Sequence, residues 1–364
     1  MTGDLYIGLM SGTSLDGVDA ALVDLAGTRP RVISSAHRPF DAALRAELLA
    51  LNSPGYDEIA RAAAAGNELA QAYAAAVQAV LGDADVRTAE VRAVGCHGQT
   101  VRHRPERGYT TQIGNPALLA ERCGIRVVAD FRSRDIAAGG QGAPLAPAFH
   151  AELFLDRDEN RAVLNLGGIA NLTQLACDGS VAGFDCGPGN CLMDLWCARH
   201  TNFPFDRAGE WAAGGRILPE LLARLRQEPY FAQPPPKSTG RDLFNEAWLH
   251  AKLGPHDDPR HVQATLLELT ACSVAEAIES HLPVTQRVIA CGGGTKNVAL
   301  MARLEELLKP ATLEPSDRQG IASQLVEAIG FAWLAKQALQ GVPGNLPSVT
   351  GARGLRVLGA IYPP

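Results

Sequence analysis

Gly8-Leu9-Met10-Ser11-Gly12-Thr13-Ser14-Leu15-Asp16-Gly17-Val18-Asp19 is the stretch from which the fold of this chain is best predicted. Apolar residues 5–7 precede it and the β-favouring residues 20–23 follow it. This order predicts a strand, a turn rich in Gly, Ser and Thr, and a second strand. Such a turn can present backbone N–H groups and hydroxyls to a phosphate, because few Cβ atoms block the approach. An ordinary Gly-rich hairpin is the alternative interpretation.

Two carboxylates in this stretch, Asp16 and Asp19, are candidate metal ligands. Mg²⁺ prefers carboxylates, waters and phosphate oxygens. The sequence contains no P-loop of the pattern GxxxxGK(S/T). The stretch therefore indicates nucleotide phosphate chemistry on a framework other than a P-loop.

The composition is typical of a soluble globular protein. The chain has 364 residues, of which 46% are hydrophobic and 20% charged, and its length is sufficient for two domains. A formal net charge of −6 without a Lys/Arg cluster argues against a nucleic-acid partner. The N-terminus lacks a signal-peptide pattern and no apolar run is long enough to span a bilayer. We therefore expect a cytoplasmic protein with no membrane partner.

The eight cysteines form no C-x-x-C motif, and several lie in apolar runs. Buried free thiols in a reducing cytoplasm are the expected state. A metal site built on Cys186, Cys191 and Cys197 is an alternative, but the spacing of these residues does not favour it.

The first half of the chain alternates helical and strand patterns. Residues 42–81 predict two helices separated near Ser53-Pro54-Gly55. Strands are predicted at residues 91–96, which end in the polar cluster 97–100, and at 125–129, which end in Asp130. Open α/β sheets bind ligands at such strand ends.

The second half restarts near Arg161 with the same order of elements. A strand at 162–166, a Gly-rich turn at 167–171 and a returning strand at 172–175 lead to a further strand at 181–185. The repeated strand, Gly turn and strand predict two halves that face each other across a cleft, each with a phosphate-binding turn.

The remaining elements of the second half follow in order. Residues 234–242 are expected to form a surface loop and 261–281 a helix. A strand at 287–291 leads through glycines to a helix at 298–308, an arrangement that suits a nucleotide phosphate or ribose. A helix at 324–339 and a strand-like segment at 355–358 complete the chain.

Nine stretches, in the expected order along the chain, resemble one family. They are residues 8–19, 97–100, 112–115, 129–144 (ADFRSRDIAAGGQGAP), 165–173 (NLGGIANLT), 183–190 (GFDCGPGN), 237–242, 292–297 and 343–352 (PGNLPSVTGA). The family that they resemble is anhydro-N-acetylmuramic acid kinase, within the sugar kinase, Hsp70 and actin superfamily. Thr295-Lys296 departs from the expected small residue and Arg, which affects the expected nucleotide contacts and leaves the chemistry unchanged.

The resemblance implies an α/β protein with the two-domain actin-like ATPase fold and a central inter-domain cleft. Residues 1–140 with the tail 343–364 are expected to bind sugar and phosphate, and residues 141–342 the nucleotide. The implied cofactors are ATP and Mg²⁺, and the implied assembly is a homodimer. The implied reaction opens the anhydro ring of 1,6-anhydro-N-acetylmuramic acid with water and phosphorylates O6, which yields N-acetylmuramic acid 6-phosphate and ADP in peptidoglycan recycling.

By this resemblance Asp185 is the general base that activates the water. It follows an apolar strand and precedes Gly187-Pro188-Gly189, whose small residues leave room for water and sugar. Inverting glycosidases use a second carboxylate as acid, whereas here phosphoryl transfer can capture the leaving oxygen. The alternative is a carboxylate that caps the following turn.

Half of the residues implied in nucleotide binding are glycines of predicted turns. For the γ-phosphate and Mg²⁺ they are Gly12, Thr13, Ser14, Asp16, Gly17 and Asp19; for the β-phosphate Gly167, Gly168 and Asn171; and for the ribose and adenine Gly292, Gly293 and Asn297. Each group on its own has a plain turn as its alternative, and only the three groups together argue for a nucleotide.

The sugar carries a lactyl carboxylate and an N-acetyl group. Arg132 is the candidate for the carboxylate, because Arg presents a planar fork of donors. Asp130, which precedes it at the strand end, is a candidate sugar ligand, and His97 and Gln99 are candidates for the sugar hydroxyls. Glu327 is a further candidate sugar ligand. A packed His97 and a solvated Glu327 are the alternatives.

Two other functions share these motifs. An Hsp70- or actin-like ATPase would use the phosphate turns but requires a peptide-binding module or a polymer interface. A kinase for a plain amino sugar would use Asp185 to deprotonate a hydroxyl, and it would phosphorylate N-acetylmuramic acid itself.

Overall fold

The computed structural model describes residues 3–12, 15–235, 237–241 and 243–364. The chain divides into two compact units: a first unit of Met1–Leu153 with Leu325–Pro364, and a second unit of Phe154–Gln324. These boundaries differ from the expected ones near residues 140 and 342. Helix α12 (Val326–Gln340) lies in the first unit because it packs on β1, β2, β4 and β7 of that unit.

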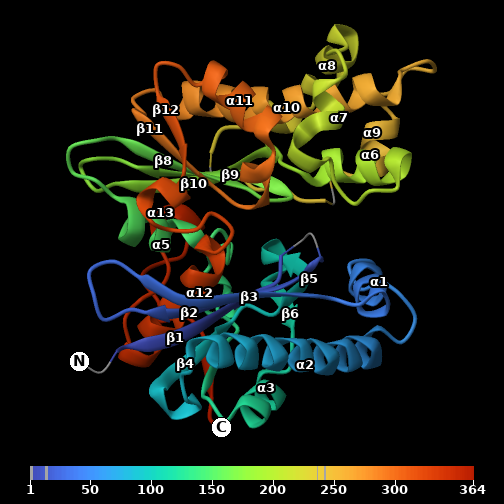
Figure 1. Ribbon diagram of the computed structural model, residues 1–364. Coiled ribbons are helices and arrows are strands. Elements are labelled where there is room, and N and C mark those ends of the chain that lie inside the picture. The colour runs from blue at the N-terminus through green and yellow to red at the C-terminus, as the bar shows by residue number, and fades with distance from the viewer. Residues whose placement is uncertain (1–2, 13–14, 236, 242) are drawn as a thin grey trace. The chain divides into compact units, whose positions relative to one another are not determined.

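The first unit is built on a six-stranded sheet with the order β13-β7-β4-β1-β2-β3 (Figure 1). Its strands are β1 (Leu5–Met10), β2 (Gly17–Asp24), β3 (Arg31–Pro39), β4 (Val91–Cys96), β7 (Val127–Ala129) and β13 (Ala360–Tyr362). Strands β1, β4 and β7 are parallel, and the predicted β1–β2 hairpin is confirmed. The strand expected at 355–358 is wrong: the last strand is β13, whose Ile361 pairs with Val128 at the sheet edge.

Helices and a small hairpin complete the first unit. The predicted break near Pro54 is confirmed, since α1 (Ala42–Ala50) and the long α2 (Glu58–Ala84) are separate helices. The other elements are α3 (Pro116–Cys123), α4 (Ser133–Ala137), α5 (Ala146–Phe154), α13 (Pro347–Thr350), and the two-stranded sheet of β5 (Gln99–Arg104) and β6 (Tyr109–Ile113). Helix α2 packs on β2 and β3, and Ala and Val make up most of its buried residues, which allows a close approach.

Gly8 is needed for the packing of α12 on the sheet. A Cβ atom at Gly8 would overlap the carbonyl oxygen of Ala328 on α12, and one at Gly95 would overlap the carbonyl oxygen of Phe331. The helix can therefore lie directly on β1 and β4 only because both strands carry glycine at the point of contact.

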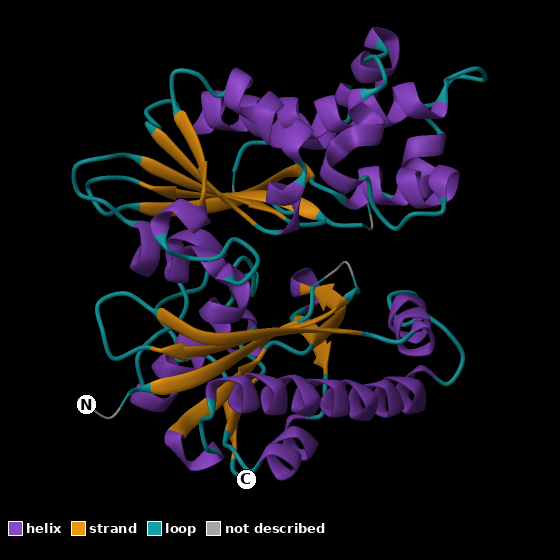
Figure 2. Cartoon of the chain, viewed as in Figure 1, coloured by secondary structure: helices purple, strands orange, loops and turns teal. Residues whose placement is uncertain are grey.

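The second unit contains a five-stranded sheet with the order β10-β9-β8-β11-β12. Its strands are β8 (Arg161–Leu166), β9 (Ile169–Leu175), β10 (Val181–Pro188), β11 (Arg287–Cys291) and β12 (Thr312–Pro315). Three antiparallel strands are followed by two strands parallel to β8. The first unit has the same plan in β3-β2-β1-β4-β7, so the repeat predicted from the sequence is present in the topology of both units. The strands of the two sheets are orange in Figure 2 and the helices purple.

Helices pack on this second sheet and share the hydrophobic core of the unit with it. They are α6 (Cys191–Thr201), α7 (Glu210–Ala213), α8 (Pro219–Arg226), α9 (Glu246–His250), α10 (Pro259–His281) and α11 (Val298–Leu307). Helix α10 is the predicted 261–281 helix and buries most of its length against β10, α6, α8 and α11. All eight cysteines are free and six of them are buried, as predicted. In the described part of the chain, no helix has the length and apolarity needed to cross a membrane.

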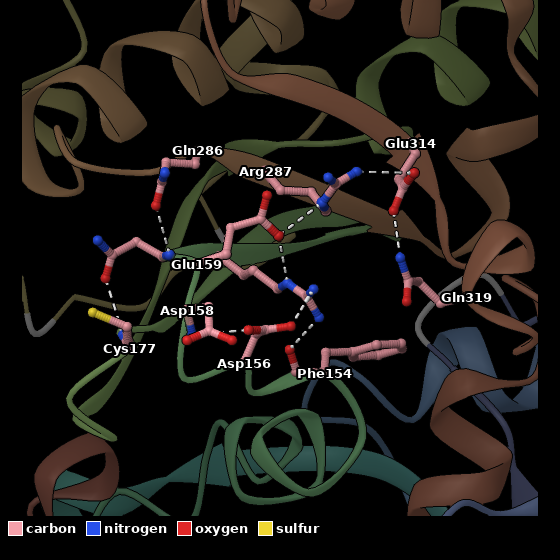
Figure 3. Close-up of polar contacts among 11 residues, drawn as sticks. Phe154, Asp156, Asp158, Glu159, Cys177, Gln286, Arg287, Glu314 and Gln319 are labelled. Carbon is pink, nitrogen blue, oxygen red and sulfur yellow. Dashed lines mark hydrogen bonds and ion pairs between the residues drawn. The ribbon is translucent and has the colours of Figure 1, made fainter.

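A network of charges joins the amino ends of β8 and β11 (Figure 3). Glu159 Oε2 lies 2.8 Å from Arg161 Nε and 2.9 Å from Arg287 Nε. Arg161 also pairs with Asp156 at 2.6 Å, and Arg287 pairs with Glu314 at 3.2 Å. Because most of these side chains are more than two-thirds buried, the pairs are screened less than surface pairs are.

Candidate functional site

Asp185 lies at an irregularity in strand β10. Asp185 pairs with Asn171 of β9, but Gly187 pairs with Ala170, so Cys186 is the extra residue of a β-bulge. Bulges re-aim side chains next to the point where they interrupt a strand, and they are frequent beside active sites. The bulge lies in the carboxyl-terminal half of β10 (Val181–Pro188), a strand that runs in the same direction as β8.

Three hydrogen bonds hold Asp185 to the segment 230–239. The Thr239 backbone N–H donates to Asp185 Oδ2 at 2.9 Å, and the Asp185 N–H donates to the Lys237 carbonyl at 3.1 Å. The Tyr230 hydroxyl donates to the Asp185 carbonyl at 2.8 Å. The partners are distant in sequence, and none belongs to Gly187-Pro188-Gly189, of which the first two residues lie in β10. This argues against the turn-capping alternative.

The environment of Asp185 weakens its acidity. Burial raises the pKa of Asp185 to about 6, while the Thr239 N–H and the Lys237 ammonium act in the opposite direction. A carboxylate with this pKa is ionised at neutral pH and is a stronger base than an ordinary Asp. The arrangement can therefore accept a proton from a water or a hydroxyl near neutral pH.

The glycine turn of the second unit is shorter than predicted. Only Gly167 and Gly168 lie between β8 and β9, whereas Asn171 is within β9 and pairs with Asn165 and Asp185. The carbonyls of both glycines accept N–H donors from the 189–191 segment: Gly167 from Asn190 at 2.9 Å, and Gly168 from Gly189 at 2.9 Å. The NLGG and GPGN stretches are thus bonded to each other beside Asp185.

The predicted ribose and adenine residues follow β11. Gly292 has φ +85°, and a Cβ there would lie 2.5 Å from Asn165 Oδ1, so the turn requires glycine. Gly293 is exposed and has open space around its Cα. The Asn297 side chain accepts from the Leu300 N–H at 3.0 Å and caps α11, a structural task separate from any nucleotide contact.

The N-terminal turn of the first unit joins β1 to β2. The Gly12 carbonyl accepts the Gln99 side-chain amide at 3.3 Å, and Gly17 is the buried first residue of β2. Asp16 is exposed, and Asp19 Oδ1 lies 2.9 Å from His37 Nδ1. Among the described residues no group of three or more His, Cys, Asp or Glu side chains forms a metal site. Thr13 and Ser14 lie outside the described residues.

His97 and Arg132 meet at the carboxyl ends of β4 and β7. Arg132 Nε donates to His97 Nε2 at 3.1 Å, and Arg132 Nη1 donates to the Gly142 carbonyl at 2.8 Å. Burial lowers the pKa of His97 to about 3, so the ring is neutral and accepts the bond. Burial also lowers the pKa of Arg132 to about 10, against the opposing charges of Glu327 and Asp135, and Arg132 remains a cation at neutral pH.

The other predicted sugar ligands, Glu327, Gln99 and Asp130, differ in burial and in their hydrogen-bond partners. The structure brings Glu327 of α12 close enough to Arg132 for its charge to act on the guanidinium. Gln99 is buried, and its Oε1 has no hydrogen-bond partner within the part of the chain that the structure describes. Asp130 is exposed and accepts from the N–H of Ser133, the first residue of α4, at 3.3 Å.

Asp135 is a buried carboxylate that the sequence did not single out. Its Oδ1 accepts from Asn345 Nδ2 at 2.7 Å and from Thr350 Oγ1 at 2.8 Å, while Oδ2 accepts from the Gly142 N–H at 2.8 Å. Asp135 thereby joins the 129–144 and 343–352 stretches and supports the loop whose Gly142 carbonyl holds Arg132. Tyr230 and Lys237 are two further residues that the sequence analysis did not single out. Lys237 lies in the 237–242 stretch that resembled the family, whereas Tyr230 lies in none of the nine stretches.

Comparisons with known proteins indicate one family over nearly the full length of the chain. The family model "Anhydro-N-acetylmuramic acid kinase" matches residues 4–364. Curated proteins named anhydro-N-acetylmuramic acid kinase include one from Nitrosospira multiformis, 52% identical over 365 residues with 100% of each chain covered. Another, from Variovorax paradoxus, is 56% identical over 374 residues, again with 100% of each covered.

Solved structures show a weaker likeness. The (R)-2-hydroxyglutaryl-CoA dehydratase component A from Acidaminococcus fermentans has a TM-score of 0.49 at 12% identity, covering 90% of this chain and 96% of that one, and adds nothing to the assignment. The family match and the relatives at more than 50% identity are sufficient. The chain belongs to the anhydro-N-acetylmuramic acid kinase family.

Proposed function

We propose that this protein is an ATP-dependent kinase that opens the ring of 1,6-anhydro-N-acetylmuramic acid with water and phosphorylates O6. The products are N-acetylmuramic acid 6-phosphate and ADP, in peptidoglycan recycling. The observation that carries the proposal is Asp185: in a chain of this family, a carboxylate at a β-bulge is held by three hydrogen bonds and has a pKa raised toward neutrality.

The proposed step balances with one carboxylate. Water adds its oxygen to C1 of the sugar, and its proton goes to Asp185. The C1–O6 bond breaks, and the O6 electron pair forms the new bond to the γ-phosphorus as the bond to ADP breaks. A glycosidase would need a second carboxyl group to protonate O6, whereas here the phosphoryl group takes that place.

The glycine turns and two carboxylates support the nucleotide part of the proposal. Gly12 and Gly17, with Thr13 and Ser14, are proposed for the γ-phosphate, and the Gly167-Gly168 turn is proposed with Asn171 for the β-phosphate. Gly292, Gly293 and Asn297 are proposed for the ribose and adenine; Gly293 is exposed with open space at its Cα, which suits a close approach.

Asp16 and Asp19 are the proposed holders of Mg²⁺. Carboxylates are donors that this ion prefers, and both residues are at least partly exposed in the structure, so the donor set fits. When bound, Mg²⁺ supplies charge neutralisation for the phosphates.

Sugar recognition is assigned to the cluster around Arg132. We propose that the guanidinium pairs with the lactyl carboxylate and that Gln99, whose buried Oε1 has no partner in the described chain, binds a hydroxyl or the N-acetyl N–H. His97 is given a different role from the one expected: its Nε2 faces Arg132 and orients it. Glu327 and Asp130 are retained as sugar contacts.

The proposal also covers the assembly and the location, for which the support is the family resemblance alone. A homodimer in the cytoplasm, where ATP is available, is proposed. Sedimentation of the purified protein at several concentrations measures the assembly directly; a monomer at micromolar concentration would contradict this part of the proposal.

The function is tested by mass spectrometry in ¹⁸O-water with ATP, Mg²⁺ and 1,6-anhydro-N-acetylmuramic acid. Phosphosugar labelled at C1 is the expected product. ADP without phosphosugar would indicate an ATPase. Equal turnover of intact N-acetylmuramic acid, without label at C1, would indicate a plain amino-sugar kinase.

A further inference from the structure

Lys237 is a buried cation to which the proposed reaction gives no task. The residue is only 9% exposed, and its Nζ lies 5.0 Å from the centroid of the Tyr230 ring. The ammonium donates to the carbonyls of Phe231 at 3.2 Å and Tyr230 at 3.4 Å. Because burying a charge is unfavourable without partners, these contacts are the ones that hold Lys237 inside.

The hydrogen bonds of the Lys237 ammonium join the two ends of the segment 230–239. Residues 234–236 are prolines, which have no backbone N–H to donate. Lys237 follows these prolines in the sequence, and η4 (Pro229–Ala232) precedes them. The Lys237 ammonium donates back to two carbonyls of η4. The two ends of the segment are thereby tied together.

Both ends of the tied segment contact Asp185. Tyr230, at one end, donates from its hydroxyl to the Asp185 carbonyl. At the other end the Lys237 carbonyl accepts the Asp185 N–H, and the Thr239 N–H donates to Oδ2. A shift of either end would therefore move the backbone or the carboxylate of Asp185.

Other titratable groups also face Lys237. Asp185 and Cys186 approach from β10 and Tyr230 from η4, while Glu276 and His281 of α10 line a pocket of about 100 Å³ with Lys237. Burial lowers the pKa of Lys237, and its charge in turn lowers the pKa of Asp185 against the larger effect of burial.

We propose that Lys237 is a positioning residue for Asp185, which ties the 230–239 segment so that the Thr239 N–H and the Lys237 carbonyl hold Asp185 in place. Its effect on activity rests on the proposed function. Its effect on the ionisation of Asp185 does not, and this permits a test that is independent of turnover.

The test compares Lys237→Met with Lys252→Met in the full-length protein. Lys252 is a matched control, since its Nζ also lies over an aromatic ring, 5.8 Å from that of Trp248 in the same unit. Asp185 is titrated by NMR with ¹³C-carboxyl Asp and assigned by the signal lost in Asp185→Asn. Lys237→Met is expected to raise the Asp185 pKa by about one unit and to lower kcat about tenfold or more. Lys252→Met is expected to change neither.

Two more variants cover the case in which Lys237→Met does not fold. Lys237→Arg keeps the charge and is expected to leave the Asp185 titration unchanged, while kcat falls because the longer fork does not fit. Tyr230→Phe removes only the hydroxyl and is expected to lower kcat with the titration unchanged.

A folded Lys237→Met, judged by circular dichroism, with wild-type titration and kcat would overturn the proposal. So would wild-type kcat in both Lys237→Arg and Tyr230→Phe. If the wild-type protein makes no phosphosugar, the proposed function fails, and the Asp185 titration alone then decides the role of Lys237.

Discussion

The two ends of the parallel strands carry different chemistry in the second unit. At the amino ends of β8 and β11, Arg161 and Arg287 share Glu159 in a partly buried ion-pair network (Figure 3). At the carboxyl ends the same strands run into Gly167-Gly168 and Gly292. Charged side chains are paired at one end, and half-buried glycines follow the strands at the other.

The first unit repeats this contrast. Near the amino end of β1, Asp4 pairs with Lys336 at 3.2 Å and with Arg92 at 3.7 Å. The carboxyl ends lead to Gly12, to His97 and to the segment that carries Arg132. Both units share one strand order, with ion pairs near the amino ends of their parallel strands. We propose that the carboxyl ends serve ligand chemistry, because open α/β sheets bind ligands there.

The largest effect is expected from Asp185→Asn at a carboxyl end. Loss of a general base costs about 10²–10⁴-fold in rate, so kcat should fall by that factor. Because the folded state raises the pKa of this carboxyl, its ionised form opposes folding above that pKa, and removing the charge should not lower Tm at pH 7.5. Steady-state kinetics and calorimetry measure both quantities.

Asp178→Asn is the matched control for this variant, since Asp178 lies in an exposed turn of the same unit. It should keep wild-type kcat. An Asp185→Asn protein that retains kcat within twofold would remove Asp185 from the base role.

A smaller effect is expected from Arg132→Met. Loss of hydrogen bonds to a charged group costs about 1.5–3 kcal/mol, or roughly 10- to 150-fold, and this should appear in KM for the sugar with little change in KM for ATP. The wild-type protein should prefer 1,6-anhydro-N-acetylmuramic acid to an anhydro sugar that lacks the lactyl group, and the variant should lose this preference. Arg134→Met, at an exposed position of α4, is the control, and equal sugar KM values for the two variants would contradict the assignment.

The smallest effect on activity is expected at the amino ends. Glu159→Gln removes the shared partner of two arginines, whose side-chain hydrogen bonds hold the pKa of Glu159 below its usual range. The stability that this carboxylate contributes is fully present above its pKa in the unfolded chain. It is lost as the pH falls through its lower pKa in the folded protein. At pH 7.5 the free energy of unfolding of the variant should be about 1–3 kcal/mol lower than that of the wild type. The variant should keep wild-type kcat.

Urea unfolding checks this prediction, with Glu306→Gln of the exposed Arg303–Glu306 pair as the control. Unchanged stability in Glu159→Gln, or a rate loss in a folded variant, would mean that the amino ends do not have the role described.

Much of the fold was predictable because the apolar runs and turn residues are local signals. The β1–β2 hairpin, the α1–α2 break and the strands β4 and β11 all follow from such runs. The last strand was misplaced to 355–358 because the position of an edge strand depends on its partner β7, which no local pattern reveals. The chain belongs to the family that its motifs resembled, and the two-domain α/β fold class is confirmed.

The site was only partly predictable, because its supports are distant in sequence. Asp185 was identified through its motif, yet its partners Tyr230 and Thr239 lie 45 and 54 residues away. Asp135 joins residues more than 200 positions apart. The role of His97 depends on Arg132 of the neighbouring strand end, so its residue type alone indicated only a polar contact.

The most direct test of the account is the pH dependence of kcat/KM for the anhydro sugar in the wild-type protein. Asp185 must be ionised to accept a proton, so the rate should be constant above neutrality and fall tenfold per pH unit below about 6, the pKa that burial gives Asp185. Glu159→Gln should show the same profile. A wild-type rate that stays constant down to pH 4.5, where an Asp with a pKa of 6 is protonated, would contradict the assignment of Asp185 as the base.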